Sequence, residues 1–421
     1  MDPNRMTATE AAAAIAAGRL SAAELMEACL ARAAERDATL RAFVHLDPAL
    51  ARRNAGRARP GPLHGIPFGV KDVLDTADMP TQHGSPIYAG HRPRGDSAAV
   101  AAAKGAGGVI MGKTVTTEFA TRHPGLTTNP HHPGHTPGGS SSGSAAAVAA
   151  GLLPLAFGTQ TAGSIVRPAS YCGVVGFKPS YGTFHRGGMK VCSESLDTIG
   201  IMARSVADCA FAMGAMTGRA HGDPEAKRDR PPRLGLTLGH APGDATPEMA
   251  ALLHGVADAA RRAGAEVVDF VLPQPLLDAA ALHPWLMGME TLQGLAWEYA
   301  EARPQLSAAL LDRLDWAAGF PVAKLREARL AQHAAIEAIA PAMAGLDALL
   351  TPSAPGEAPE GLHHTGDATF NLLWTTIRGP NVTIPAGRGP KGLPMGVQLV
   401  ALVGRDAEVL SAARWVQAAL G

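Results

Sequence analysis

The sequence predicts an α/β fold, and three neighbouring segments carry that prediction. Residues 66–70 form a short apolar run after Pro60-Gly61-Pro62, residues 97–107 have a helical pattern, and residues 108–112 form a second apolar run. Short apolar runs bounded by glycine and proline are typical of buried strands, and strands that alternate with helices predict a sheet with helices packed on it. The chain has 421 residues, of which 46% are hydrophobic, so it can bury a sizeable core.

The first part of the chain, about residues 1–55, is expected to be mostly helical. Two helices are predicted between residue 7 and about residue 37, and Ser21-Ala22-Ala23-Glu24 is a capping box for the second. The alanine run at residues 11–17 follows the charged Glu10 and leads into an amphipathic pattern, which is unlike a secretory signal. No stretch approaches the ~20 apolar residues that cross a bilayer, so we expect a soluble cytoplasmic protein.

Charge and cysteine usage narrow the class of protein further. Lys+Arg and Asp+Glu both number 37, so the formal net charge is zero. This balance favours neither nucleic acid nor a membrane surface as a partner. The cysteines form no CxxC pair and show no disulfide framework, so we interpret them as free thiols in a reducing compartment. They are Cys29, Cys172, Cys192 and Cys209.

The second half of the chain continues the alternation of strands and helices. A charged, proline-ended loop at residues 222–233 is the best candidate for a subdomain break inside one domain that spans residues 1–421. No internal repeat is visible. The elements expected after the loop are a strand at 234–238, a helix at about 247–264, a strand at 266–272, mostly helices to about 344, a strand at 347–351, and a strand and helix at 395–403 and 406–420.

The glycine- and serine-rich turn at residues 138–144 admits three interpretations. A phosphate-binding loop requires a lysine after its second glycine, and here Ser144 stands in that place. A nucleophile elbow, G-x-S-x-G, requires a preceding apolar strand, whereas residues 129–135 are rich in proline and histidine. A flexible linker suits the composition, but a small-residue helix at 144–150 and an apolar strand at 152–158 follow directly. Glycine-rich turns between such buried elements indicate that something approaches the backbone closely.

A second small-residue turn, Thr161-Ala162-Gly163-Ser164, follows the strand predicted at 152–158. Small residues let successive backbone N–H groups converge on one point, and such a group of donors can hold the oxyanion that forms when a hydroxyl attacks a carbonyl. Ser164 would be the attacking group. The alternative is an ordinary tight turn with a solvated serine.

A serine hydroxyl is a poor nucleophile until a base takes its proton, and Lys71 is the candidate base. Lys71 ends an apolar run, where burial would disfavour its charged form and lower its pKa below the usual ~10.4. The alternative is a surface lysine. The histidine cluster at residues 131–135 could ligate a metal, but it lacks a helix to align the imidazoles. We interpret that cluster as a surface loop or as part of the mouth of the site.

Two of these segments together resemble the amidase-signature family of serine hydrolases. Residues 65–76 contain Lys71, and residues 138–169 contain Ser140 and Ser164 at a separation of 24 residues. The resemblance continues through residues 174–181, 196–200 and 381–398, and so covers nearly the whole chain. It implies an α/β fold with a mixed central β-sheet that has helices on both faces.

The family resemblance also implies a catalytic triad. By this resemblance Ser164 is the nucleophile, Ser140 is a serine that follows a cis peptide bond, and Lys71 is the base. The backbone amides of Thr161, Ala162, Gly163 and Ser164 would form the oxyanion hole. No metal or organic cofactor is implied, and a homodimer is expected.

Several positions depart from the commonest family pattern. Ser142 stands where glycine is usual, Ala162 replaces the first of two glycines, and Gln160 replaces an aspartate. Arg167 lies three residues after Ser164, whereas many relatives place the arginine two after the nucleophile. These departures resemble the small-amide branch of the family, which includes malonamidase and ureide-processing amidases. Residues 76–90, 353–356 and 365–375 resemble malonamidase as well.

The same resemblance suggests how substrate is held. In the malonamidase branch the arginine that matches Arg167 is associated with the substrate carboxylate, and a guanidinium fork can bind a carboxylate through two parallel hydrogen bonds. The alternative for Arg167 is a structural ion pair that holds the turn. We expect Arg167, Thr159 and Gln160 to contact the substrate.

The expected activity is hydrolysis of a small-molecule amide that bears a carboxylate, such as malonamate, to an acid and ammonia through an acyl-enzyme on Ser164. A carboxybiuret-type ureide is an alternative substrate. The glutaminase subunit of a transamidation complex, or a non-catalytic protein that has kept the fold, would also fit the sequence. Gln160 and the short chain argue against the glutaminase.

Overall fold

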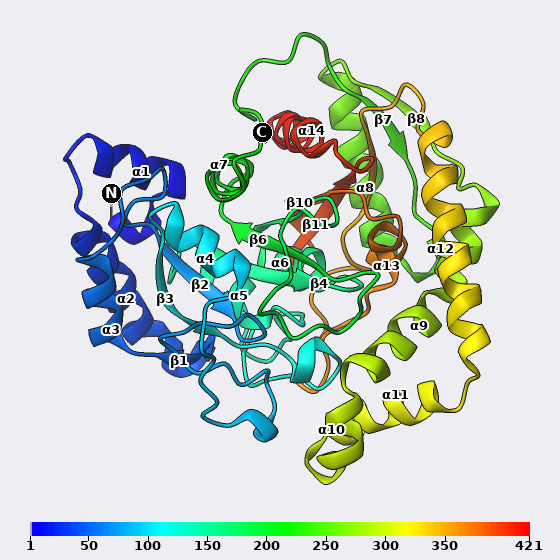
Figure 1. Cartoon of the computed structure of the whole chain (residues 1–421). Helices are drawn as coiled ribbons and strands as arrows, with labels where there is room; N and C mark the ends of the chain where they lie inside the picture. Colours follow the sequence, from blue (N-terminus) through cyan, green and yellow to red (C-terminus); the bar gives the residue numbers. More distant parts are fainter. Residues whose placement is uncertain (1) are drawn as a thin grey trace.

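An eleven-stranded mixed β-sheet runs through the molecule (Figure 1). The computed structural model describes residues 2–421. From one edge to the other the strands are β1 (Phe43–Leu46), β3 (Val109–Thr114), β2 (Pro67–Lys71), β4 (Leu155–Gln160), β6 (Thr198–Ala203), β5 (Val175–Lys178), β10 (Asn381–Arg388), β11 (Pro394–Val400), β9 (Ala348–Pro352), β7 (Arg233–Leu236) and β8 (Glu266–Asp269).

Parallel and antiparallel pairs both occur in this sheet. Strand β2 runs parallel to β3 and β4, and β7 runs parallel to β8 and β9. The strands between these two groups pair in the antiparallel sense. The predicted α/β fold with a mixed central sheet is therefore confirmed.

Helices surround the sheet, and in order they are α1 (Ala8–Ala16), α2 (Ala22–Leu40), α3 (Pro48–Ala55), α4 (Ala98–Gly105), α5 (Ser142–Ala149), α6 (Val166–Cys172), α7 (Val206–Thr217), α8 (Pro247–Arg262), α9 (Gln274–Gly294), α10 (Ala296–Glu301), α11 (Ala308–Ala318), α12 (Val322–Ala342), α13 (Thr369–Thr376) and α14 (Asp406–Ala419). Helix α2 begins with the predicted capping box, because Ser21 and Glu24 each accept a backbone N–H from the other residue. Among residues 2–421 no helix is both long and apolar enough to cross a membrane.

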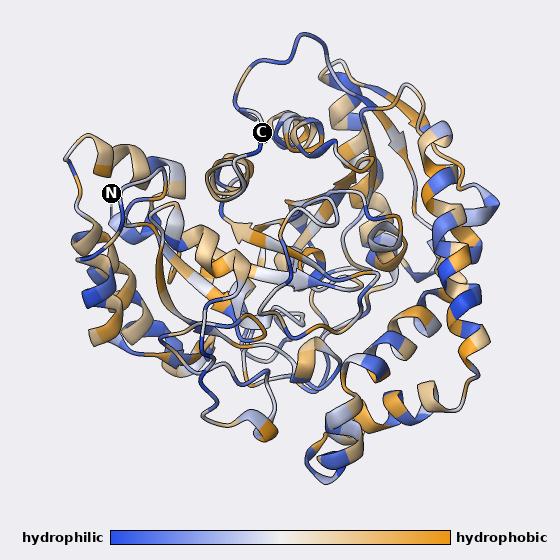
Figure 2. Ribbon diagram, in the orientation of Figure 1, coloured by the Kyte–Doolittle hydropathy of each residue, from blue (hydrophilic) through white to orange (hydrophobic). Residues whose placement is uncertain are grey.

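Both faces of the central strands are covered. Successive side chains of a strand point to opposite faces, and every residue of β2, β3, β4 and β6 is buried. Helix α5 packs on these central strands and on α6, and α6 packs on β5, β10 and β11. Helices α7 and α14 pack on each other and on strands of the same sheet. Hydrophobic residues fill the strands, and hydrophilic residues mark outer faces such as that of α12 (Figure 2).

Most predicted elements are found within a few residues of their expected bounds, and the N-terminal segment contains one strand that was not predicted. Residues 43–46 form the edge strand β1 inside the segment that was expected to be mostly helical. This strand exists because it pairs with β3, from Phe43 opposite Thr114 to Leu46 opposite Gly112. A four-residue strand with one distant partner has no periodic signal of its own.

The loop at residues 222–233 links α7 to β7 and is largely hydrophilic (Figure 2). Strand β7 begins at Arg233, the last residue of this range, and pairs with β9, so the same sheet continues on both sides of the loop. Arg228 and Arg230 connect the loop to Asp347, with which they form ion pairs at 3.3 and 2.9 Å, respectively.

Candidate active site

Two neighbouring parallel strands bring Lys71 and the second small-residue turn together. Lys71 is the last residue of β2, and Gln160 is the last residue of β4. Because β2 and β4 are parallel neighbours, their carboxyl ends lie at the same edge of the sheet, and the turn at residues 161–164 leaves from that edge. Ser141 ties the first turn to the same place, since its hydroxyl lies 3.3 Å from both the N–H and the carbonyl of Thr159.

Lys71 is completely buried between two hydroxyl groups. Its Nζ lies 2.7 Å from Ser140 Oγ and 2.7 Å from Thr159 Oγ1, with the Thr159 carbonyl at 3.5 Å. It forms no ion pair with any residue between 2 and 421. Burial lowers the pKa of Lys71 to about 7, and only the more distant Asp197 and Cys192 act to raise it. The amine can therefore be neutral near physiological pH.

Ser140 sits between Lys71 and the backbone of a neighbouring loop. The peptide bond from Gly139 to Ser140 is cis. The Ser140 carbonyl accepts the N–H of Thr117 at 3.2 Å, and the Gly139 carbonyl accepts Nη2 of Arg167 at 2.7 Å. The carbonyls of Gly139 and Ser140 are thus both fixed by hydrogen bonds, and the Ser140 hydroxyl faces Lys71.

Ser164 ends the second turn and is 8% exposed. Its hydroxyl has no hydrogen-bond partner among residues 2–421, and neither do the backbone N–H groups of residues 161–164. The next two N–H groups, of Ile165 and Val166, both donate to Gln160 Oε1 at 2.9 and 3.1 Å. Four consecutive donors without a partner, beside a serine that solvent reaches, are the arrangement expected for an oxyanion hole.

Side chains from distant helices hold the carbonyls of this turn. His283 of α9 lies with Nε2 3.3 Å from the Thr161 carbonyl, and Thr375 of α13 donates its hydroxyl to the Ala162 carbonyl at 2.6 Å. Burial lowers the pKa of His283 to about 4, so the imidazole is neutral at physiological pH. The carbonyls face α9 and α13, and the N–H groups face away from those helices.

Asp197 fixes the side chain of Thr161. The Thr161 hydroxyl donates to Asp197 Oδ1 at 2.5 Å, and the N–H groups of Cys192 and Ser193 donate to Oδ2 at 2.7 and 3.0 Å. Burial raises the pKa of Asp197 to about 6, although its hydrogen bond from Thr161 opposes this. Gly163 packs against Asn371 so closely that a Cβ atom there would collide with the Asn371 amide.

Arg167 is buried beside the first turn without a carboxylate partner. Its Nη2 donates to the Gly139 carbonyl and, at 3.2 Å, to Thr365 Oγ1, while its Nε is buried with no partner among residues 2–421. Burial lowers the pKa of Arg167, and nearby Tyr171 and Asp367 partly oppose this. Within the described part of the chain we find no ion pair that would make Arg167 a structural anchor.

The other two expected substrate contacts have partners inside the protein. Thr159 accepts from Lys71, as described above. Gln160 is completely buried, its Oε1 accepts the two N–H groups at the start of α6, and its Nε2 donates to Thr375 Oγ1 at 2.8 Å. Both side chains therefore lie next to the candidate catalytic groups but turn toward the protein interior.

Sequence reasoning missed four residues that shape this site. His283, Thr375, Asn371 and Asp197 contact the turn from chain segments that lie far away in the sequence. Residues 365–375 and 196–200 carried the family resemblance, and that was the only signal that pointed toward three of them. His283 stood in no motif.

The histidine cluster at residues 131–135 packs on another loop. His135 is buried, its Nδ1 lies 2.7 Å from the Ala358 carbonyl, and its ring lies against His132 with ring centroids 4.7 Å apart. His131 Nε2 lies 2.9 Å from the Cys172 carbonyl. Among residues 2–421 no three His, Cys, Asp or Glu side chains are grouped so as to hold a metal ion.

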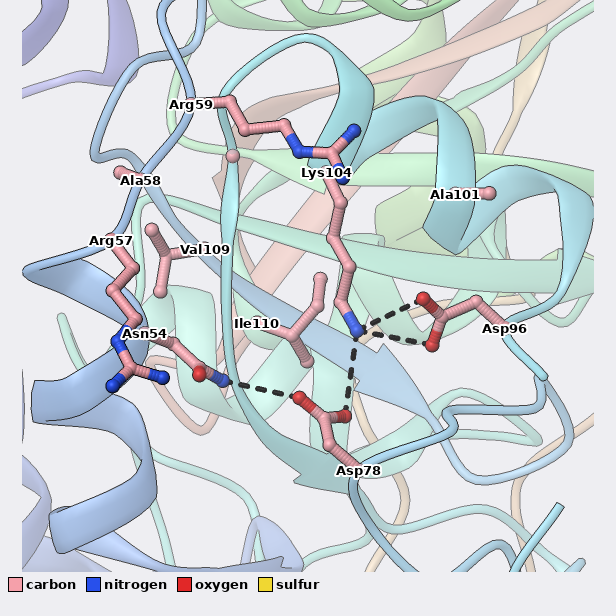
Figure 3. Close-up of a pocket in the computed structure, with 11 residues that line it drawn as sticks. Asn54, Arg57, Ala58, Arg59, Asp78, Asp96, Ala101, Lys104, Val109 and Ile110 are labelled. Carbon is pink, nitrogen blue, oxygen red and sulfur yellow. Dashed lines mark hydrogen bonds and ion pairs between the residues drawn. The ribbon is translucent and has the colours of Figure 1, made fainter. Parts of the chain in front are cut away.

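A surface pocket of about 310 Å³ lies near the opposite end of β2 and β3 (Figure 3). Val109 and Ile110 line it, and they pair with the first residues of β2, whereas Lys71 is the last. Its Lys104 is paired with Asp96 at 3.0 Å and with Asp78 at 3.5 Å. The pocket is remote from the serines, and the charge of Lys104 is already balanced by the two aspartates. We therefore assign no chemistry to this pocket.

Comparison with known proteins connects this geometry to a family. Residues 24–410 match the model of the family described as Amidase. A glutamyl-tRNA(Gln) amidotransferase subunit of Cereibacter sphaeroides is 32% identical over 100% of this chain and 98% of its own length. The corresponding subunit of Chloroflexus aurantiacus is 42% identical, but that match covers 51% of this chain and 47%, about half, of the relative.

Solved structures are similar over almost the whole chain. A crystal structure of an amidase has a TM-score of 0.90 and 29% identity, and covers 99% of this chain and 100% of that one. A second has a TM-score of 0.87 and 28% identity, with 98% of both chains covered. It is described as a vestigial protein complex that reveals the evolutionary origins of an s-triazine catabolic enzyme.

Proposed function

This chain belongs to the amidase family, whose members hydrolyse amide bonds, and from that premise we propose that it cleaves a small, carboxylate-bearing amide such as malonamate to an acid and ammonia. The observation that carries the choice of substrate is Arg167. A buried guanidinium with no carboxylate partner is costly, and a substrate anion would supply the missing charge and hydrogen bonds.

Lys71 and Ser140 activate Ser164 in the proposed cycle. Neutral Lys71 directs its N–H bonds at the hydroxyl and carbonyl of Thr159, and its lone pair then faces the Ser140 hydroxyl. Ser140 gives its proton to Lys71 as it accepts the proton of Ser164. The freed Ser164 oxygen attacks the amide carbon. This is the logic of the Ser-His-Asp triad with different proton carriers.

The unpaired N–H groups of residues 161–164 stabilise the oxyanion of the tetrahedral intermediate. Protonated Lys71 then returns its proton through Ser140 to the amide nitrogen, the C–N bond breaks, and ammonia leaves. An acyl group remains as an ester on Ser164. Water attacks this ester by the reverse sequence of proton transfers, which releases the acid and restores the neutral lysine.

Arg167 orients the substrate carboxylate in this proposal. Its unpaired Nε is one donor of the fork that binds a carboxylate, and its Nη2 already contacts the Gly139 carbonyl next to Ser140. A carboxylate held there would lie close to the serines, so a short acyl chain is favoured. The resemblance of residues 76–90, 353–356 and 365–375 to malonamidase supports the same class of substrate.

A carboxylated ureide, such as a carboxybiuret, is a second candidate. It carries the same carboxylate next to a hydrolysable amide, and one of the similar structures is linked to s-triazine catabolism. A third candidate is a glutaminase that feeds ammonia to partner subunits, because the curated relatives are amidotransferase subunits. In our proposal the chain acts as a homodimer without such a partner.

Ammonia release by the purified chain from malonamate and from propionamide tests the proposal. A charge-assisted pair of hydrogen bonds contributes about 3 kcal/mol, so we expect kcat/KM for malonamate to exceed that for propionamide by about 100-fold. The variant Arg167→Gln should bring this ratio close to one. Equal turnover of both amides by the wild type would show that Arg167 does not bind the carboxylate.

The same assay separates the remaining candidates. Turnover of a carboxylated ureide at a higher kcat/KM than malonamate would transfer the proposal to ureides. Release of ammonia from L-glutamine only after partner subunits are added would replace it with the glutaminase. Light scattering of the purified chain checks the homodimer.

A further inference from the structure

Gln160, Thr375 and the turn at residues 161–164 form a directed chain of hydrogen bonds. We propose that Gln160 and Thr375 are positioning residues that aim the Gly163 N–H at the reacting oxygen, and that Gln160 does not bind substrate. This inference rests on the proposed function, because it assigns a task to the oxyanion hole of that mechanism.

The direction of these hydrogen bonds follows from the orientation of the Gln160 amide. Two backbone donors, the N–H groups of Ile165 and Val166, face one end of the Gln160 amide at 2.9 and 3.1 Å. That end must be the oxygen, so the other end is the NH₂ group and can only donate. It donates to Thr375 Oγ1 at 2.8 Å.

The Thr375 hydroxyl must then donate elsewhere. Two carbonyls are near it, that of Ala162 at 2.6 Å and that of Asn371, in its own helix, at 3.2 Å. A threonine inside a helix usually donates to the carbonyl four residues earlier, here Asn371, so the shorter contact marks a departure from the usual pattern. The hydroxyl proton therefore goes to Ala162.

The consequence for the oxyanion hole comes from the planarity of the peptide. In a trans peptide the carbonyl and the N–H point in opposite directions. The Ala162 carbonyl shares its peptide with the Gly163 N–H, so a carbonyl held toward α13 turns that N–H away from α13 and into the site. His283 acts in the same way on the preceding peptide, whose carbonyl belongs to Thr161.

A carboxylate in place of the Gln160 amide would reverse the direction of the hydrogen bond between residue 160 and Thr375. It could still accept from Ile165 and Val166, but it could not donate to Thr375. The Thr375 hydroxyl would then donate to the carboxylate, and the Ala162 carbonyl would lose its partner. Gln160 and Thr375 are both buried, so water cannot replace the lost donor without rearrangement.

Four single variants test the proposal with the best amide substrate of the wild type. Thr375→Val removes the hydroxyl at constant shape, Gln160→Glu removes the donor, and Thr375→Ser restores the hydroxyl. The matched control is Thr376→Val, because Thr376 is equally buried in α13 and its hydroxyl only donates to the Leu372 carbonyl of the same helix at 2.8 Å.

We expect kcat to fall about 10- to 100-fold in Thr375→Val and Gln160→Glu with KM changed less than about threefold, because the oxyanion exists only after attack. Thr375→Ser and Thr376→Val should stay within about threefold of wild type. The double variant Gln160→Glu/Thr375→Val should lose no more activity than Thr375→Val alone, since both changes break one chain. Thermal unfolding midpoints should be alike in Thr375→Val and Thr376→Val.

Labelling of Ser164 by a fluorophosphonate, detected by measuring the mass of the intact protein, distinguishes failure of this inference from failure of the proposed function. If the wild type is labelled and hydrolyses the amide while Thr375→Val equals Thr376→Val in kcat, this inference is wrong and the proposed function stands. If the wild type is neither labelled at Ser164 nor active on amides, both fail. A loss that appears only in KM would also overturn the inference, because it would indicate a role in substrate binding.

Discussion

Lys71 and Lys113 are both buried at the carboxyl ends of neighbouring parallel strands, yet their surroundings differ. Lys113 forms an ion pair with Asp72 at 3.2 Å and also donates to the Leu74 carbonyl at 2.9 Å. Lys71 has only hydroxyl and carbonyl partners. A buried lysine without a counter-charge is the one that loses its proton at the lower pH, and this is the property a general base requires.

The activity of the enzyme should therefore depend on pH through Lys71. In the proposed mechanism Lys71 acts as a base only when unprotonated, so kcat/KM should rise with pH through about 7, the depressed pKa of Lys71, and then level off. Lys71→Met should lower kcat by at least about a thousandfold. A pH–rate profile from pH 5.5 to 9 and steady-state kinetics check both statements.

Lys178 supplies a control for this assignment. Burial lowers its pKa to about 7 as well, but its amine donates to the carbonyls of Pro179 and Gly379 and lies outside the proposed mechanism. A folded Lys178→Met variant should keep the wild-type pH–rate profile. If instead the profile is lost in Lys178→Met and kept in Lys71→Met, Lys71 is not the base.

The turn between β4 and α6 depends on a close approach to α13. An added Cβ at Gly163 would collide with the Asn371 amide, whose Nδ2 is held by the Ser353 carbonyl at 2.9 Å and cannot easily move aside. Gly163→Ala should displace the turn and lower kcat by about 100-fold or more. Steady-state kinetics on the amide substrate measure the loss.

Gly255→Ala is the matched control for that glycine. Gly255 lies in α8, an added Cβ there would meet no neighbouring atom, and alanine favours a helix over glycine by about 1 kcal/mol. This variant should keep wild-type kcat and unfold at a slightly higher temperature. Equal activity of Gly163→Ala and Gly255→Ala would mean that the turn tolerates displacement.

Elements were predictable from sequence where the signal was local. Strands β2, β3 and β4 are apolar runs bounded by glycine and proline, and α2 begins at a capping box. Strand β10 lacked such a signal, because Pro385 and Gly387 flank an irregularity in its pairing with β11. Strand β6 contains Gly200, which packs against the Phe177 carbonyl and weakens the strand pattern in the sequence.

Residues of the candidate site were likewise predictable only where their signal was local. Lys71, Ser140 and Ser164 stand in local motifs, so their selection needed no knowledge of distant contacts. The bonds from Thr375 to Ala162 and from His283 to Thr161 join residues 213 and 122 positions apart. No spacing along the chain encodes such a contact, which arises only when α9 and α13 pack together beside the turn.

Buried titratable groups should give the folded protein a stability maximum at alkaline pH. Lys71 and Lys178 bind fewer protons in the folded state than in the unfolded state, so the free energy of unfolding should rise with pH from about 7 toward 10. Burial raises the pKa of all four cysteines, which makes the unfolding free energy fall above the ordinary thiol pKa of about 8.5.

The effects of the lysines and the cysteines on the free energy of unfolding should cancel at about pH 8.5 to 9, where the folded and unfolded states bind about equal numbers of protons at these groups. Urea unfolding in a reducing buffer at intervals between pH 6.5 and 10 measures the curve. Lys178→Met should flatten the rise below the maximum, move the maximum to lower pH and steepen the fall above it, because only one lysine then opposes the effect of the thiols. A stability that declines steadily from pH 6.5 would contradict the neutral state of the two lysines.

The ends of the large sheet carry a consequence for solubility. Strands β1 and β8 are its outermost strands, and each has only four residues. Strand β8 begins with Glu266 and ends with Asp269, both exposed, and Glu266 pairs with Arg233 at 2.8 Å. Strand β1, by contrast, carries no Asp, Glu, Lys or Arg, so its short length alone limits pairing there. A short edge strand, and more so a short charged one, offers a poor template for strands of another molecule. A sheet of eleven strands can therefore remain dispersed at high concentration without closing into a barrel.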